Sequence, residues 1–167
     1  MKRYMLGVLV VIFLVVPLAV SAAESAPHPL QLPDKTAIIE MVDYIEAQPL
    51  SPLADVARQN VVYYANYNDD VHVIIDPNIL PWIKQNDWSD LLLANYIAGN
   101  VRSQLQRNKR GNDSYAGLLL MIRTYEELRK NDPNIRIAEI DKQVQLLKED
   151  KLKAYVTEMD NRQAVKQ

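Results

Sequence analysis

Apolar residues recur every three or four positions along most of this chain, which is the period of amphipathic helices. The pattern predicts one helix capped by Asp34 and running to about residue 47, and a second that begins at Ser51-Pro52 and runs to about residue 67. A capping hydroxyl followed by proline is a strong helix start. The expected inward stripe of the second helix consists of Leu53, Val56, Ala57, Val61 and Tyr64.

Beyond residue 89 the pattern predicts almost continuous helix broken by short polar loops. The expected helices cover residues 90–106, a stretch capped near residues 112–114, residues 136–148, and a last stretch from about residue 150. Short loops place consecutive helices side by side in opposite directions. The predicted fold is therefore all-α, with about five main helices in an antiparallel bundle or array over residues 34–160, and a frayed tail at residues 161–167.

Residues 68–89 interrupt the helical pattern. The stretch from Val71 to Ile75 is rich in β-branched residues and predicts an extended piece. No second segment of comparable quality is available to pair with it, so it is not expected to found a sheet. Asp76-Pro77 and Pro81 favour one or two short turns in this irregular segment.

The first 22 residues have the order of a secretory signal peptide. Lys2 and Arg3 precede an apolar run and a group of small residues that ends at Ala22, where we expect cleavage, and residues 23–33 form a Pro-rich leader. The alternative is an uncleaved anchor, but the run is short for a membrane span and the next cation is Lys35. We expect export to the periplasm or the extracellular medium, with no stable membrane anchor after cleavage.

Composition narrows the classes of function. The chain contains no cysteine, which excludes disulfides, zinc–thiolate sites and a lipid attached to cysteine. Without Lys2 and Arg3 the remaining chain holds 17 basic and 21 acidic residues, a formal charge of −4. Nucleic acid and anionic lipid both need a basic surface, so neither is expected as the main partner.

Residues 125–134 (YEELRKNDPN) resemble the end of a tetratricopeptide repeat, in which an aromatic residue on the second helix is followed by an acidic-Pro-Asn turn. The resemblance covers about ten residues, and no second copy is visible, so no repeat array is expected. The layout from Asp34 to Val156 is also similar to that of small exported α-helical bacterial proteins of unassigned function. That likeness implies no particular chemistry.

Aromatic residues gather around the irregular segment. Tyr63, Tyr67, Trp82 and Trp88 form the candidate groove, because Tyr and Trp offer contact area together with a polar group. A peptide or a sugar is the kind of ligand that such a groove binds. The competing interpretation is that these rings fill gaps where helices diverge.

Asp69, Asp70, His72 and Asp76 form a weak polar cluster in the same segment. The alternating oxygen ligands from Asn66 onward resemble the start of a calcium loop, but the turn glycine and the final glutamate are missing. In an extended segment Asp69 faces away from His72 and Asp76, which divides the cluster. We assign no catalytic, cofactor-binding or metal residue.

These observations favour an exported helical binding or interaction module over an enzyme. Its partner is expected to be an envelope protein or a small ligand, and no cofactor is expected. The alternative is a carboxylate-based cell-wall hydrolase, which requires two acids across a cleft. The helical glutamates are mostly on predicted polar faces and no buried pair stands out, which is why the binding module is preferred.

Overall fold

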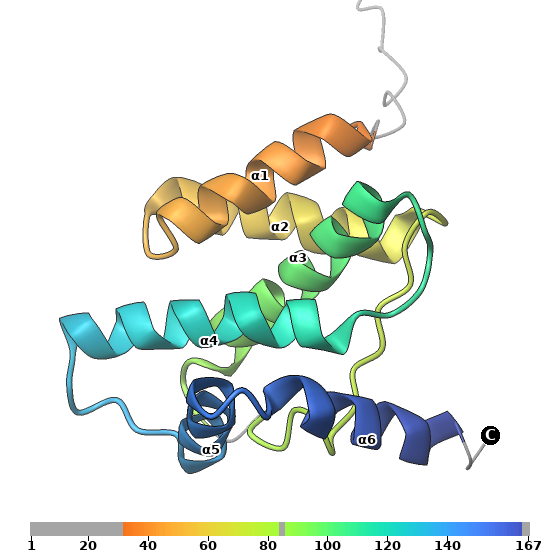
Figure 1. Ribbon diagram of the computed structural model, residues 1–167. Coiled ribbons are helices and arrows are strands. Elements are labelled where there is room, and N and C mark those ends of the chain that lie inside the picture. The colour runs from red at the N-terminus through yellow and green to blue at the C-terminus, as the bar shows by residue number, and fades with distance from the viewer. Residues whose placement is uncertain (1–31, 84–85, 165–167) are drawn as a thin grey trace, which may run out of the picture. The chain divides into compact units, whose positions relative to one another are not determined.

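Six helices make up the part of the chain that the computed structural model describes, residues 32–83 and 86–164, and this part contains no strand (Figure 1). The helices are α1 (Lys35–Ala47), α2 (Pro52–Tyr67), α3 (Ser89–Arg107), α4 (Ser114–Asn131), α5 (Ala138–Lys148) and α6 (Leu152–Ala164). The predicted all-α array is confirmed. α6 continues past residue 160, where the tail was expected to fray. The predicted signal peptide and nearly all of the leader lie outside the described residues.

Three helix starts follow directly from local capping. The side chains of Asp34, Ser51 and Asp113 accept hydrogen bonds from the backbone N–H three residues later, at 2.8, 3.1 and 3.0 Å. Each bond satisfies an N–H group that has no partner within its own helix. At the other end of α3, Asn108 adopts a left-handed conformation (φ 49°), which stops the helix.

α3 and α4 pack against each other at the centre of the fold, and α4 lies between the α1–α2 pair and the α5–α6 pair (Figure 1). The buried side chains form two hydrophobic clusters, one mainly among α1, α2 and α3 and the other mainly among α3, α4, α5 and α6. Val73 and Ile97 pack against both clusters. Within the described ranges, no helix is both long enough and apolar enough to cross a membrane.

The stretch from residue 71 to 75 belongs to no helix, strand or turn, and side chains form hydrogen bonds with its backbone where a neighbouring strand would otherwise do so. Gln104 accepts a hydrogen bond from the His72 N–H (2.9 Å) and donates one to the His72 carbonyl (3.0 Å). The Ile74 N–H donates to the Asn112 side chain, and the Tyr96 hydroxyl donates to the Ile74 carbonyl. Polar groups of α3 and of the loop before α4 therefore replace the missing strand.

One carboxylate links three helices. Glu46 near the end of α1 forms ion pairs with Arg102 of α3 and Arg123 of α4. Arg102 also pairs with Asp43, one turn earlier on α1, at 2.8 Å. This ionic contact ties α1 to the central helix pair.

Candidate functional site

The outer face of α2 carries large apolar side chains that remain accessible to solvent. Leu53 is 65 % exposed, Val56 is 54 % exposed and Tyr67 is 67 % exposed, and Leu50 just before the helix is also exposed. These are four of the six large apolar residues classed as exposed among the described residues. Scattered exposed apolar residues need no explanation, but a concentration on one helix marks a candidate binding surface.

α2 is apolar on two faces, which explains this exposure. Its outer face, here called the α2 ridge, consists of Leu53, Val56, Asn60, Tyr63 and Tyr67. Steps of three and four residues place all five on one side of the helix. The assignment of Leu53 and Val56 to the inward stripe was wrong, because Ala54 and Arg58 are buried in their place, whereas the other members of the predicted stripe are buried.

A groove of about 690 Å³ runs beside the α2 ridge, between α2 and the first turns of α3. The volume lies within the range of small-ligand and peptide pockets. The rings of Tyr63 and Tyr67 lie 4.6 Å apart at an interplanar angle of 44° and form part of one wall. Val62 of α2 and Leu91 and Ala94 of α3 add apolar surface.

Three charged residues give this α2–α3 groove an acidic character. Arg58 is buried, pairs with Asp55, and donates a second hydrogen bond to the Pro49 carbonyl at 2.8 Å. That arrangement neutralises one carboxylate. Asp90 has no ion-pair partner among the described residues and lies in the first turn of α3, so the described lining of the groove holds one more carboxylate than cations.

A second, smaller groove lies on the other side of the ridge, between α1 and α2. Its volume is about 320 Å³, and Met41, Tyr44 and Leu53 supply apolar surface with Glu40 as the one charged group. Leu53 belongs both to this groove and to the α2 ridge. The ridge and its two flanking grooves form an amphipathic surface with acidic margins.

The four predicted groove aromatics do not come together. Tyr63 and Tyr67 line the α2–α3 groove. Trp82 is fully buried in the larger hydrophobic cluster, so its ring is part of the core rather than of an open groove, which corrects its assignment. A Trp ring supplies a large apolar volume, and a core built mainly of aliphatic side chains uses it as filling. Trp88 is partly exposed just before α3 but is not among the residues that line the groove.

The predicted polar cluster is also dispersed. Asp69 and Asp70 line a separate surface pocket, and the exposed His72 is held through its backbone. Asp76 is buried, and its Oδ1 accepts hydrogen bonds from the backbone and side-chain N–H groups of Asn78, both at 2.8 Å. Among the described residues, no three His, Asp or Glu side chains are grouped so that they could hold a metal ion.

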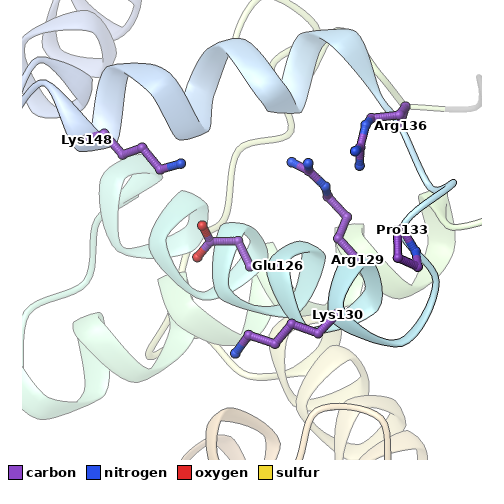
Figure 2. Close-up of a pocket in the computed structure, with 6 residues that line it drawn as sticks. All are labelled: Glu126, Arg129, Lys130, Pro133, Arg136 and Lys148. Carbon is purple, nitrogen blue, oxygen red and sulfur yellow. The ribbon is translucent and has the colours of Figure 1, made fainter.

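A third concave surface was not predicted from the sequence. It lies where α4 ends and the chain turns into α5, and it has a volume of about 370 Å³ (Figure 2). Four cationic side chains and one carboxylate line it, together with Pro133: Arg129, Lys130, Arg136, Lys148 and Glu126. We call it the basic pocket.

Comparisons of the chain with protein-family models, with curated proteins and with solved structures give no match. The tetratricopeptide resemblance of residues 125–134 therefore stays a prediction. Function is argued below from the surfaces of this chain alone.

Proposed function

We propose that this protein is a binding module whose α2 ridge and α2–α3 groove take an amphipathic segment of a partner protein that carries apolar side chains and at least one Lys or Arg. The observation that carries the proposal is the concentration of exposed apolar side chains on α2. Burying a side chain such as Leu53 or Val56 against a partner contributes about 1.5 kcal/mol or more. A helix lying along a groove is a common way to obtain that burial.

Charge favours a basic segment over other occupants. Asp90 and Glu40 lie at the two grooves, and Arg58 is already paired with Asp55. A cation on the partner complements the acidic margins and disfavours acidic competitors. A second copy of this chain would instead bring the same carboxylates face to face.

Fluorescence anisotropy with two labelled peptides tests the proposal. One is an amphipathic Leu/Lys peptide, and the other has the same leucines with Glu in place of every Lys. We expect the Leu/Lys peptide to bind and the Leu/Glu peptide to bind at least about tenfold more weakly, a difference of about 1.4 kcal/mol. Val56→Ser and Tyr67→Ser should each weaken binding, and Asp90→Asn should reduce its dependence on salt.

Ile75→Ser is the matched control, since Ile75 is also exposed but lies outside α2. It should leave binding unchanged. The proposal would be overturned if the two peptides bind equally well, or if Ile75→Ser weakens binding as much as Val56→Ser and Tyr67→Ser do. Self-association that Val56→Ser abolishes, measured by analytical ultracentrifugation, would identify a second copy of the chain as the occupant and would also overturn it.

The proposed place of action is outside the cytoplasm, on the grounds of the signal-like order of residues 1–22. An envelope partner is therefore the expected source of the basic segment. Mass spectrometry of the protein isolated from its native cells should give an N-terminus at Ala23. A mass that retains residues 1–22 would contradict this expectation.

The hydrolase alternative has no observation in its favour. In the α2–α3 groove, Asp55 is committed to the ion pair with Arg58, so it is not a free partner for a second acid. A carboxylate mechanism needs two carboxyl groups available to the substrate.

A further inference from the structure

The basic pocket brings cations from two helices and the turn between them to one space. Figure 2 shows the side chains of Arg129, Arg136 and Lys148 directed towards the gap between α4 and α5, while Lys130 points away from it. Arg129 lies in the last turn of α4, Arg136 in the turn that follows and Lys148 in the last turn of α5, and the α4–α5 turn brings the three to one pocket. Concentrating three like charges is unfavourable unless carboxylates or a bound anion compensate them.

Carboxylates of the chain compensate only part of this charge. Arg129 pairs with Asp141 at 2.9 Å, and Lys130 pairs with Glu127 at 2.5 Å outside the shared space. Arg136 donates to the backbone carbonyl of Ile135. Within the described ranges, neither Arg136 nor Lys148 has a carboxylate at ion-pair distance.

Helix dipoles explain some of the cations but not Arg136. Cations are stabilised at the C-terminal end of a helix, where Arg129 and Lys130 lie on α4 and Lys148 lies on α5. Arg136 lies just before the N-terminus of α5, where the dipole disfavours a positive charge. The helix dipole therefore does not account for its place beside the pocket.

The turn that carries Arg136 is fixed in place by Tyr125. The Tyr125 hydroxyl accepts a hydrogen bond from the Ile137 N–H (3.0 Å) and donates one to Asp141 (2.9 Å). Burial raises the pKa of this hydroxyl, which keeps it protonated as a donor. Asp141 in turn pairs with Arg129, so one partly buried network positions the Arg129 guanidinium and fixes the backbone next to Arg136.

We propose that Arg129, Arg136 and Lys148 bind the phosphate group of a small hydroxyl-bearing phosphate ester, with Glu126 accepting a hydrogen bond from a ligand hydroxyl. Guanidinium groups match the oxygen pairs of phosphate, and the lysine adds a point charge. Glu126 is the one carboxylate lining the pocket. Its charge repels a bare anion, but it can accept a hydrogen bond from a hydroxyl group on an anionic ligand. Glycerol phosphate has this chemistry, both as a free compound and as the headgroup of phosphatidylglycerol.

Isothermal titration of the purified protein with sn-glycerol 3-phosphate, and sedimentation with phosphatidylglycerol vesicles, test the two sources separately. We expect binding in at least one arm with a dissociation constant of about 1 mM or lower for the soluble compound. Glycerol alone and phosphatidylcholine vesicles should give none. Substituting Arg136→Gln together with Lys148→Gln should weaken binding at least about tenfold.

Lys109→Gln together with Arg110→Gln is the matched control, because it removes one exposed Lys and one exposed Arg from a different surface. It should leave binding within about twofold of the wild type. Glu126→Gln should strengthen binding of inorganic phosphate more than that of glycerol phosphate. The proposal would be overturned if neither glycerol phosphate nor phosphatidylglycerol vesicles bind, or if the control pair weakens binding as much as Arg136→Gln with Lys148→Gln does. Circular dichroism of each variant confirms that a loss of binding does not reflect unfolding.

Discussion

Gly117 of α4 lies directly against the backbone of Tyr96 of α3. A Cβ atom at position 117 would lie 2.7 Å from the Tyr96 carbonyl oxygen and equally close to its ring. The contact is reciprocal, since a Cβ at Gly99 of α3 would clash with the Ala116 carbonyl of α4. The two glycines allow the central helices to approach more closely than side chains would permit.

Gly117→Ala should therefore destabilise the protein even though alanine is the better helix former. The obstacle is backbone rather than a movable side-chain end, so we expect a loss of about 1 to 3 kcal/mol in the free energy of unfolding. Urea denaturation measures it. Ala154→Val, which enlarges an exposed residue of α6, is the control and should cost less than about 1 kcal/mol. A stabilised Gly117→Ala variant would contradict the close approach.

Gln104→Leu should be strongly destabilising because it removes four hydrogen bonds at once. Gln104 bonds both backbone groups of His72, the Gly111 N–H and the Asn100 side chain. Leaving several buried groups without partners costs about 1 to 3 kcal/mol for each group that water cannot reach. Gln106→Leu, on an exposed position of the same helix, is the control. If the two variants unfold at the same urea concentration, Gln104 does not hold residues 71–75 in place.

Asp160→Asn should change the pH dependence of stability. Burial is the main factor that raises the pKa of the Asp160 carboxyl, and the charges of Asp76 and Asp113 add to it, while the hydrogen bond from Ser114 opposes it. The Asp160 carboxyl therefore binds its proton more tightly in the folded state than in the unfolded state. This difference stabilises the folded state at low pH, and the stabilisation is lost as the pH rises from the ordinary pKa of aspartate through the raised pKa of Asp160.

Thermal melting across the acidic to neutral range measures this effect. The Asn variant should be more stable than wild type near neutral pH, and the advantage should shrink towards about pH 3, where the wild-type carboxyl is protonated. Asp87→Asn, at an exposed position, is the control. A variant that is less stable than wild type near neutral pH would show that the Ser114 hydrogen bond outweighs the repulsion.

Glu46→Gln should loosen the attachment of α1. The change removes the ion pairs with Arg102 and Arg123, which are partly exposed, so we expect a cost of about 1 kcal/mol. High salt should reduce the difference from wild type, because it screens the charges of the native pairs. Glu40→Gln on the same helix removes a carboxylate that has no ion pair among the described residues, and it should have little effect. A cost that does not depend on salt would argue against an ionic contact.

Much of the fold follows from local sequence signals. The caps at Asp34, Ser51 and Asp113 act over three residues, so their effect can be predicted from the chain alone. The starts of α1 and α2 were predicted on that basis. Helix α5 starts two positions later than expected, at Ala138, and the Tyr125 hydroxyl holds the N–H of Ile137 just before it.

The candidate sites were harder to predict, because they depend on packing. Periodicity shows that α2 has apolar residues on two faces, but it does not show which face is buried. Leu53 and Val56 are exposed, whereas the neighbouring Ala54 and Arg58 pack inward. The spacing of three and four along the α2 ridge was a signal that could have indicated the outer surface. The basic pocket gives no such signal, since Arg129, Arg136 and Lys148 meet only in three dimensions.

The side-chain hydrogen bonds that hold residues 71–75 also bear on aggregation. This apolar, β-branched stretch is the kind of segment that joins intermolecular sheets when it is released. Gln104, Asn112 and Tyr96 occupy its backbone in the native state. Asp70 precedes the stretch and Asp76-Pro77 follows it, so a charge and a proline act as gatekeepers when it is transiently free. Variants that disturb α3 should therefore lose solubility as well as stability.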